Sequence, residues 1–224
     1  MSRTRVKICG VTHPEDALAA AQAGADAIGL VLYPRAKRYI TVDRAREIIA
    51  VLPPFVTPVA LFLDEPSQVV LDTTAELNIR NVQLHGDESP DEVAELPGLT
   101  VVKAIRVNRE TISKELTKWR TIIAKGELKN LAGIVLETSH PTQPGGSGVA
   151  NDWDWVRQLQ ARGEFEGLPR LITAGGLKPG SVAQVVRDIK PWAVDVSSGV
   201  EGSEGRKSNE KLVAFIKEVN QASD

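Results

Sequence analysis

The chain has 224 residues, of which 42% are hydrophobic and 25% are charged, so its composition is that of a folded globular protein and not of a disordered one. Its 27 basic and 29 acidic residues leave a formal charge of −2, which argues against a general binder of nucleic acids or anionic membranes. No apolar run approaches the ~20 residues of a membrane span, the N-terminus lacks the apolar core of a signal peptide, and the single cysteine rules out an intramolecular disulfide framework. We therefore expect a soluble, cytoplasmic protein.

Short apolar segments alternate with helical segments along the whole chain. The first predicted strand begins near Arg5, and a helix over Pro14–Ala23 follows it with Thr12 as its candidate N-cap. Later strands are predicted to begin near Ala27, Thr57, Asn81, Thr100, Ala132, Arg170 and Ala193. The spacing of apolar residues also predicts a helix over Ser181–Ile189 and a last helix near Lys207 to Gln221.

Eight strands in 224 residues give 224/8 = 28 residues per repeat, close to the ~30 of a βα unit. Strict alternation of this kind is typical of a (β/α)8 TIM barrel or of a doubly wound open sheet. The even spacing and the lack of a GxGxxG turn favour the barrel. Because no long linker divides the chain, we predict one α/β domain over residues 1–224, with its active site at the C-terminal face of the barrel.

Polar side chains interrupt four predicted strands near their C-terminal ends. Strands of a parallel sheet are covered on both faces and should be apolar, and residues two apart share a face. The interrupting residues fall on one face of each strand: Lys7, Cys9, Gln83, His85, Glu137, Asp195 and Ser197. If these faces point into a barrel, they converge at its C-terminal mouth, where such folds keep their chemistry.

Each of these residues also has a purely structural interpretation. Cys9 could be a small buried hydrophobe, and Lys7 could form a structural ion pair with Asp195. His85 could be a core histidine, and Glu137 a charge at the end of a strand. Four strands that break the apolar rule together favour a functional site, because an unpaired buried charge is costly.

Three turns concentrate glycine, at Gly145–Gly148, Ala174–Gly176 and Ser197–Gly202. The last two follow the seventh and eighth strands, where barrels often bind phosphate through backbone N–H groups. Plain tight turns are the alternative for any one of them, but two adjacent turns in this position indicate a phosphorylated ligand. A metal site is not expected, since the histidines are scattered at His13, His85 and His140.

A short basic run, Arg35–Arg38, follows the second strand. Such runs are usually solvated loops. Here the run lies at the rim where the other polar groups converge, so one arginine could hold a ligand carboxylate in a bidentate pair. Tyr39 is expected to pack and not to stack on a ligand.

Six ordered segments resemble the phosphoribosylanthranilate isomerases of tryptophan biosynthesis and span nearly the whole chain. They are KICGVTHPEDA (Lys7–Ala17), GLVLYPRAKRYI (Gly29–Ile40), VQLHGDE (Val82–Glu88), GGSG (Gly145–Gly148), ITAGGL (Ile172–Leu177) and VDVSSGVE (Val194–Glu201). The KICG and QLHGDE segments are specific to that family. The AGG and SSG turns are shared with other phosphate-binding barrels and discriminate less.

The resemblance implies a single barrel that converts N-(5-phosphoribosyl)anthranilate to 1-(2-carboxyphenylamino)-1-deoxyribulose 5-phosphate by an Amadori rearrangement without a cofactor. Cys9 matches the general base, which takes a proton from C2 of the ring-opened Schiff base, and Arg38 matches the residue that binds the anthranilate carboxylate. The positions that match the phosphate cradle are Gly146, Gly175, Gly176, Ser198 and Gly199. Those that match the lining of the substrate pocket are Lys7, Gln83, His85 and Asp195.

Elementary acid–base chemistry agrees with these roles. A thiol of pKa ~8.5 is only a few per cent thiolate at neutral pH, and a nearby cation such as Lys7 would raise that fraction. The partner of the base must be a carboxylic acid that burial keeps protonated, so that it protonates the furanose oxygen as the ring opens.

The general acid is where this chain departs from the family, because Glu137 stands in place of an aspartate. The extra methylene moves the carboxyl group by roughly 1 Å, and a misplacement of that size can cost about a hundredfold in rate. Three outcomes follow: Glu137 reaches the ring oxygen from a shifted backbone, the enzyme is slow, or the pocket serves another substrate. The intact pocket motifs favour the first two.

Other functions compete with this one. A sugar-phosphate isomerase such as that of histidine biosynthesis would share the phosphate turns but use two aspartates, and KICG argues against it. A non-catalytic or slow barrel that binds a phosphosugar or an aromatic acid would explain Glu137 as a mark of lost catalysis, whereas an oligomeric scaffold has no positive support. The expected partner is a small phosphorylated substrate, not nucleic acid or membrane, and we expect a monomer or a weak homodimer. The sequence leaves open whether the loop over Thr138–Pro144 closes over substrate.

Overall fold

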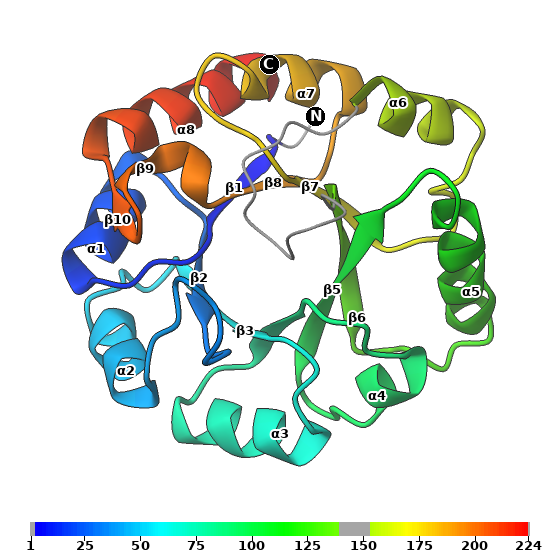
Figure 1. Ribbon diagram of the computed structural model, residues 1–224, viewed down its shortest axis with the longest axis horizontal. Coiled ribbons are helices and arrows are strands. Elements are labelled where there is room, and N and C mark those ends of the chain that lie inside the picture. Colours follow the sequence, from blue (N-terminus) through cyan, green and yellow to red (C-terminus); the bar gives the residue numbers. More distant parts are fainter. Residues whose placement is uncertain (1–2, 139–152, 224) are drawn as a thin grey trace.

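A computed structural model describes residues 3–138 and 153–223 of the chain. Eight parallel strands close into a barrel in sequential order, and a helix follows each strand on the outside (Figure 1). The strands are β1 (Arg5–Ile8), β2 (Ala27–Val31), β3 (Thr57–Phe62), β4 (Asn81–Leu84), β5 (Thr100–Val107), β6 (Leu131–Thr138), β7 (Arg170–Ala174) and β8 (Ala193–Val196). The helices are α1 (Pro14–Ala23), α2 (Val42–Ala50), α3 (Ser67–Glu76), α4 (Pro90–Ala94), α5 (Ile112–Ala124), α6 (Trp153–Ala161), α7 (Val182–Ile189) and α8 (Asn209–Ser223). Because β8 pairs with β1, the predicted barrel is confirmed and the open sheet is wrong.

The main hydrophobic core lies between the barrel and its helices. Alternate strand residues such as Val6, Ile8 and Ile28 point outward and are fully or almost fully buried, and Phe215 of α8 joins the same cluster. A second, smaller cluster fills the barrel interior with Ala104, Val135, Ile172, Ala174 and Ala193. The two clusters explain why the strands are apolar on both faces except near their C-terminal ends.

The cap of α1 and the ends of α7 and α8 differ from the sequence prediction, and α7 begins at Val182 instead of Ser181. The N-cap residue of α1 is His13 and not Thr12, because Pro14 occupies the first helical position, and the Thr12 hydroxyl instead donates a hydrogen bond of 2.6 Å to the carbonyl oxygen of Gly205. Helix α8 begins at Asn209, so Lys207 precedes it. No helix in the described part of the chain is long and apolar enough to cross a membrane.

A small hairpin precedes the last helix and ends at Lys207, where we expected that helix to begin. It consists of β9 (Glu201–Ser203) and β10 (Arg206–Lys207), which pair antiparallel, and it follows the one-turn helix η1 (Ser198–Val200). The carboxylate of Asp16 in α1 accepts hydrogen bonds from the Arg206 guanidinium at 3.1 Å and from the Lys207 backbone N–H at 2.9 Å. The hairpin is thereby held against α1, beside the mouth of the barrel (Figure 1).

Candidate active site

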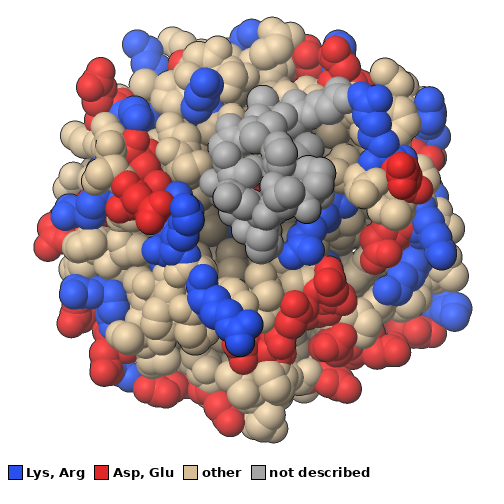
Figure 2. Space-filling view, viewed as in Figure 1, with Lys and Arg blue, Asp and Glu red and all other residues tan. Residues whose placement is uncertain are grey.

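The polar residues that interrupt the strands do converge at the C-terminal mouth of the barrel. Strand register places Glu137 opposite Ala174, Ala174 opposite Asp195, and Asp195 opposite Lys7, on four adjacent strands. Ala174, between these two acidic neighbours, is buried in the apolar cluster of the barrel interior. On the face seen in Figure 2, several Lys and Arg side chains border a hollow near the centre of the barrel.

Lys7 and Asp195 form a buried ion pair beside Cys9. The Nζ atom of Lys7 lies 2.9 Å from Oδ2 of Asp195, and both residues are less than 9% exposed. Burial acts to lower the pKa of Lys7, but Asp195 and Cys9 more than offset it, so that the pKa is raised and the amine stays charged. A Cβ atom added to Gly29 would lie 2.8 Å from Cys9 Sγ and 3.0 Å from Lys7 Nζ, so the thiol and the amine both pack against this glycine.

The Cys9 thiol is in an environment that disfavours the thiolate. Burial raises the pKa of the thiol, and the charge of Asp195 acts in the same direction. Lys7 acts to lower the pKa, as the sequence suggested, but does not reverse the effect of burial. The sign expected for Lys7 is therefore confirmed, but burial, which the sequence did not show, has the larger effect on the pKa of the thiol.

Glu137 contacts His85 across the mouth. The Nε2 atom of His85 lies 2.8 Å from Oε2 of Glu137, and the Gln83 side-chain amide lies 3.0 Å from His85 Nδ1. Gln83 is 1% exposed, and its Oε1 atom has no hydrogen-bond partner among the described residues. The three residues form a chain that runs from the barrel interior to the carboxyl group at its mouth.

A buried ion pair fixes the loop that follows His85. Glu88 accepts hydrogen bonds from the backbone N–H groups of Asp64 at 2.9 Å and Gly86 at 3.1 Å. Lys103 lies 3.0 Å from Glu88 and donates a hydrogen bond of 2.7 Å to the carbonyl oxygen of Gly86. The Gly86 backbone is thus held on both sides, which limits the movement of the adjacent His85.

Arg38 is held by a carboxylate of the protein itself. Its Nε and Nη2 atoms donate hydrogen bonds of 2.6 and 2.8 Å to the two oxygens of Glu201. Its aliphatic chain crosses Gly10, where an added Cβ would lie 2.4 Å from Arg38 Cδ, and Gly10 adopts φ +65°. Arg38 is thereby placed next to the residue that follows Cys9.

The glycine turns after β7 and β8 lie against each other. Gly175 and Gly176 have φ values of +93° and +65°, which favour glycine. A Cβ atom on Gly199 of η1 would lie 1.8 Å from the carbonyl oxygen of Leu177, so no side chain fits there. Backbone rather than side chains therefore lines this part of the mouth. Gly146 and the rest of the turn at Gly145–Gly148, as well as His140 and all but the first residue of the loop Thr138–Pro144, lie outside the described residues.

Two residues of this site had no signal in the sequence. Glu201 appeared only as the end of the VDVSSGVE segment, and Lys207 was assigned to a helix. Both are charged residues in a loop, a pattern that normally indicates a solvated surface. Their burial follows from the hairpin docking onto α1, which no local pattern predicts.

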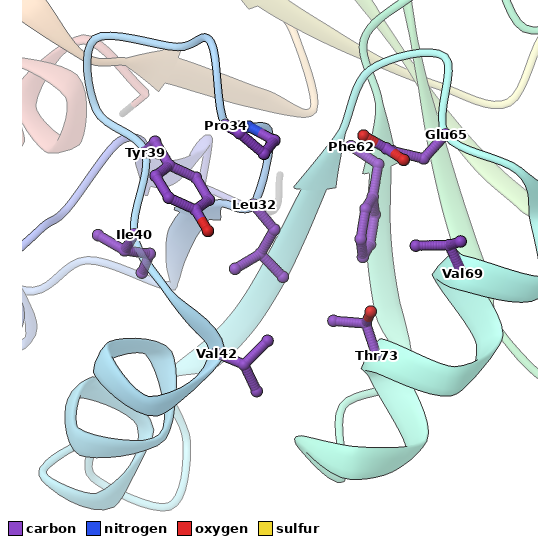
Figure 3. Close-up of a pocket in the computed structure, with 9 residues that line it drawn as sticks. All are labelled: Leu32, Pro34, Tyr39, Ile40, Val42, Phe62, Glu65, Val69 and Thr73. Atoms are coloured by element: carbon purple, nitrogen blue, oxygen red, sulfur yellow. The ribbon is translucent and has the colours of Figure 1, made fainter.

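An apolar groove lies on the outside of the barrel between α2 and α3 (Figure 3). It is lined by Leu32, Pro34, Tyr39, Ile40, Val42, Phe62, Glu65, Val69 and Thr73, with no Lys or Arg among them. Tyr39, which we expected to pack, lines this groove but is 40% exposed. The groove therefore offers no charge that would hold a phosphate group. Within the described ranges, no group of His, Cys, Asp and Glu is arranged to hold a metal ion.

Fold and site together define a (β/α)8-barrel protein with a thiol, a carboxyl group and glycine-lined turns at its C-terminal mouth. A profile of the family "N-(5'phosphoribosyl)anthranilate (PRA) isomerase" matches residues 6–218. The chain belongs to this family of aldose–ketose-type isomerases.

Named relatives and solved structures agree with this assignment. An N-(5'-phosphoribosyl)anthranilate isomerase of Trichlorobacter lovleyi is 40% identical over 218 residues, which cover 97% of this chain and 98% of that one. The crystal structure of the phosphoribosyl anthranilate isomerase from Thermotoga maritima superposes with a TM-score of 0.83 at 35% identity, covering 97% of this chain and 99% of that one. A structure of such an isomerase in complex with reduced 1-(o-carboxyphenylamino)-1-deoxyribulose 5-phosphate has a TM-score of 0.80, also at 35% identity and with the same coverage.

Proposed function

We propose that the chain isomerises N-(5-phosphoribosyl)anthranilate to 1-(2-carboxyphenylamino)-1-deoxyribulose 5-phosphate in tryptophan biosynthesis, with Glu137 as general acid and Cys9 as general base. One observation carries the assignment of roles. A buried thiol directly after β1 and a histidine-bound carboxyl group on β6 lie at the same mouth of the barrel.

The first step opens the furanose ring. Glu137 gives a proton to the ring oxygen as the bond from this oxygen to C1 breaks, and the anthranilate nitrogen supplies the electron pair that forms the iminium. Ring opening by this route needs a protonated acid, and the contact of 2.8 Å between His85 Nε2 and Glu137 Oε2 supports this role because it fixes the orientation of the carboxyl group. His85 and Gln83 line the substrate pocket in this proposal and also position the acid.

The second step transfers hydrogen from C2. Cys9 as thiolate removes the C2 proton, whose electrons form the enol double bond while the iminium becomes a neutral amine. A proton then returns to C1 as the enol becomes the ketone, which gives the aminoketose with no net gain or loss of protons. Lys7 lies against the same glycine as the thiol and stabilises the thiolate when it forms.

The two ends of the substrate are both anionic. Gly175, Gly176, Ser198 and Gly199 would hold the phosphate through backbone N–H groups, and Arg38 would bind the anthranilate carboxylate. Gly146, which lies outside the described residues, is proposed for the phosphate site on the resemblance alone. Lys7 and Asp195 line the pocket between the two ends. The cytoplasmic location and the monomeric or weakly dimeric state stay predictions.

The proposal is tested by steady-state turnover of freshly prepared phosphoribosylanthranilate, followed by the loss of its fluorescence, with Cys9→Ala beside the native chain. We expect clear turnover by the native chain and none above the no-enzyme control for Cys9→Ala, which should still bind the reduced product analogue. Tight binding of the analogue without turnover by the native chain would instead identify a non-catalytic binding barrel. Near-native turnover by Cys9→Ala would show that another group is the base.

A further inference from the structure

Glu201 lies at the centre of a buried network of three charges. Its carboxylate accepts the two hydrogen bonds from Arg38, and its Oε1 atom also lies 3.0 Å from Nζ of Lys207. The side chains are 7% exposed for Glu201, 13% for Arg38 and 0% for Lys207. Burial alone would raise the pKa of Glu201, but the bonds from the two cations lower it, so the group is held as the carboxylate.

Lys207 connects this network to the turn beside η1. Besides Glu201, its Nζ atom donates a hydrogen bond of 3.1 Å to the carbonyl oxygen of Ser197, the residue before η1. The backbone N–H of Ser208 bonds to the carbonyl oxygen of Val200 at the other end of that turn. Lys207 and its neighbour thus hold η1 at both ends.

The charges in the network do not cancel. Two cations face one carboxylate, which leaves a net charge of +1 and an environment that attracts a further anion. The bidentate bond uses Nε and Nη2 of Arg38, while Nη1 makes no hydrogen bond to any described residue. The side-on edge of the guanidinium is therefore occupied by Glu201, and the end that carries Nη1 is left for a ligand.

We propose that Glu201 and Lys207 are positioning residues that set the spacing between the two anionic ends of the substrate. Glu201 turns Arg38 so that it meets the anthranilate carboxylate end-on, and Lys207 ties the same carboxylate to the phosphate turn η1. The inference rests on the proposed function, because it takes Arg38 and η1 as the two anion sites. It goes beyond that function by assigning roles to two residues that touch no reacting atom.

The chain offers a matched control for both substitutions. Lys37 and Glu204 form an ion pair of 3.2 Å between the same two segments, but their side chains are 69% and 63% exposed. Exposed ion pairs of this kind contribute little to the stability of a fold. The control variants Lys37→Met and Glu204→Gln should therefore leave binding and turnover unchanged.

The test compares binding of two ligands by calorimetry: the reduced product analogue, which carries both anionic ends, and ribose 5-phosphate, which carries only the phosphate. In Glu201→Gln an NH2 group replaces one carboxylate oxygen and faces Arg38 or Lys207, so Arg38 should turn away from it. We expect the analogue to bind about tenfold more weakly, whereas the affinity for ribose 5-phosphate should change by less than about twofold. In turnover, KM should rise about tenfold while kcat falls by less than about threefold. Lys207→Met should weaken the binding of both ligands, because η1 also loses the hydrogen bond from Lys207 to the Ser197 carbonyl oxygen.

A double-variant cycle separates positioning from a general loss of structure. If Glu201 acts through Arg38, the variant Arg38→Met/Glu201→Gln should bind the analogue no more weakly than Arg38→Met alone. Additive losses, or an analogue affinity in Glu201→Gln equal to that of the native chain, would overturn the inference while native turnover keeps the proposed function intact. A native chain that neither turns over phosphoribosylanthranilate nor binds the analogue would overturn both.

Discussion

His85 Nε2 and Glu137 Oε2 lie 2.8 Å apart, so the group assigned as the general acid forms a hydrogen-bonded pair with a titratable partner. A hydrogen bond at this distance needs one proton between the two atoms, and the other carboxyl oxygen of Glu137 can carry the proton that goes to the ring oxygen. The second ring nitrogen of His85, Nδ1, lies 3.0 Å from the side-chain nitrogen of Gln83. Gln83 therefore determines the tautomer of His85: its NH2 group can donate only to an unprotonated Nδ1, so a neutral His85 carries its proton on Nε2 and donates it to Glu137.

We predict that Nδ1 of His85 is unprotonated and accepts a hydrogen bond from the Gln83 side-chain NH2 group, so that Nε2–H donates to Glu137. Substitution of Gln83→Met keeps the length of the side chain but removes the donor, so the preference for unprotonated Nδ1 should be lost and kcat should fall by at least about tenfold. Nitrogen-15 NMR of histidine-labelled protein reports the tautomer directly, and His85→Gln identifies the resonances. A proton on Nδ1 of neutral His85 in the native chain would contradict this account of the acid.

The Cys9 thiol should require alkaline pH to ionise in the unliganded protein, because burial raises its pKa above the ordinary value. The ultraviolet absorbance of the thiolate, with Cys9→Ser as the blank, should therefore increase with pH later than that of a free thiol. Lys7 acts to lower this pKa, so Lys7→Met should shift the titration to still higher pH. A titration that moves to lower pH in Lys7→Met would show that the amine does not stabilise the thiolate.

The contact between the two glycine turns should be intolerant of a single methyl group. An added Cβ at Gly199 would lie 1.8 Å from the Leu177 carbonyl oxygen, so Gly199→Ala must push η1 away from the loop after β7. We expect a loss of about 1–3 kcal/mol of stability and a loss of ribose 5-phosphate binding of at least about tenfold. Gly202→Ala is the matched control, since its Cβ would have its nearest neighbour at 3.7 Å. Equal phosphate affinities in the two variants would exclude η1 from the phosphate site.

The ion pair of Lys7 and Asp195 should be costly to break on one side only. Asp195→Asn leaves the buried Lys7 cation without its carboxylate and should lower the free energy of unfolding by about 3–5 kcal/mol, measured in urea. Lys7→Met/Asp195→Asn removes both charges and should recover part of that loss.

The same pair gives a pH dependence. The folded state raises the pKa of Lys7, so the stabilisation is fully present below the unfolded value of about 10.4 and is lost only as pH rises through the folded value. The stability difference between the native chain and Lys7→Met/Asp195→Asn, which has neither charge, should therefore stay constant through neutral pH and decrease only in strong alkali. A difference that already decreases near neutral pH would contradict the raised pKa of Lys7.

The strands and their polar faces could be predicted from the sequence because both follow from local periodicity. A residue such as Lys7 or Asp195 shares a face with its neighbours two positions away, and a parallel barrel brings those faces together. The pairing of these two residues was therefore one of the alternatives that the sequence offered. Closure of the barrel could be predicted from the number and the even spacing of the strands.

The parts that could not be predicted depend on contacts between distant segments. Thr12 has the chemistry of an N-cap, but the helix begins one residue later and the hydroxyl of Thr12 bonds to Gly205, which is distant in sequence. Lys207 is next to a helix, yet the docking of its hairpin on Asp16 makes it a buried partner of Glu201. The effect of Lys7 on the pKa of the Cys9 thiol was predicted with the correct sign. The burial of the thiol depends on the packed structure, and it has the larger effect on this pKa.

The most direct test of the central claim is the steady-state turnover of phosphoribosylanthranilate by Glu137→Gln and Glu137→Asp beside the native chain. The amide is similar in size to the carboxyl group but cannot give up a proton, so we predict that Glu137→Gln loses at least about a hundredfold in kcat. Glu137→Asp keeps the acid and should retain clear turnover, faster than native if the longer side chain is a handicap and slower if the site is built around it. Native-like turnover by Glu137→Gln would contradict the claim, because the proton for ring opening would then have to come from another group.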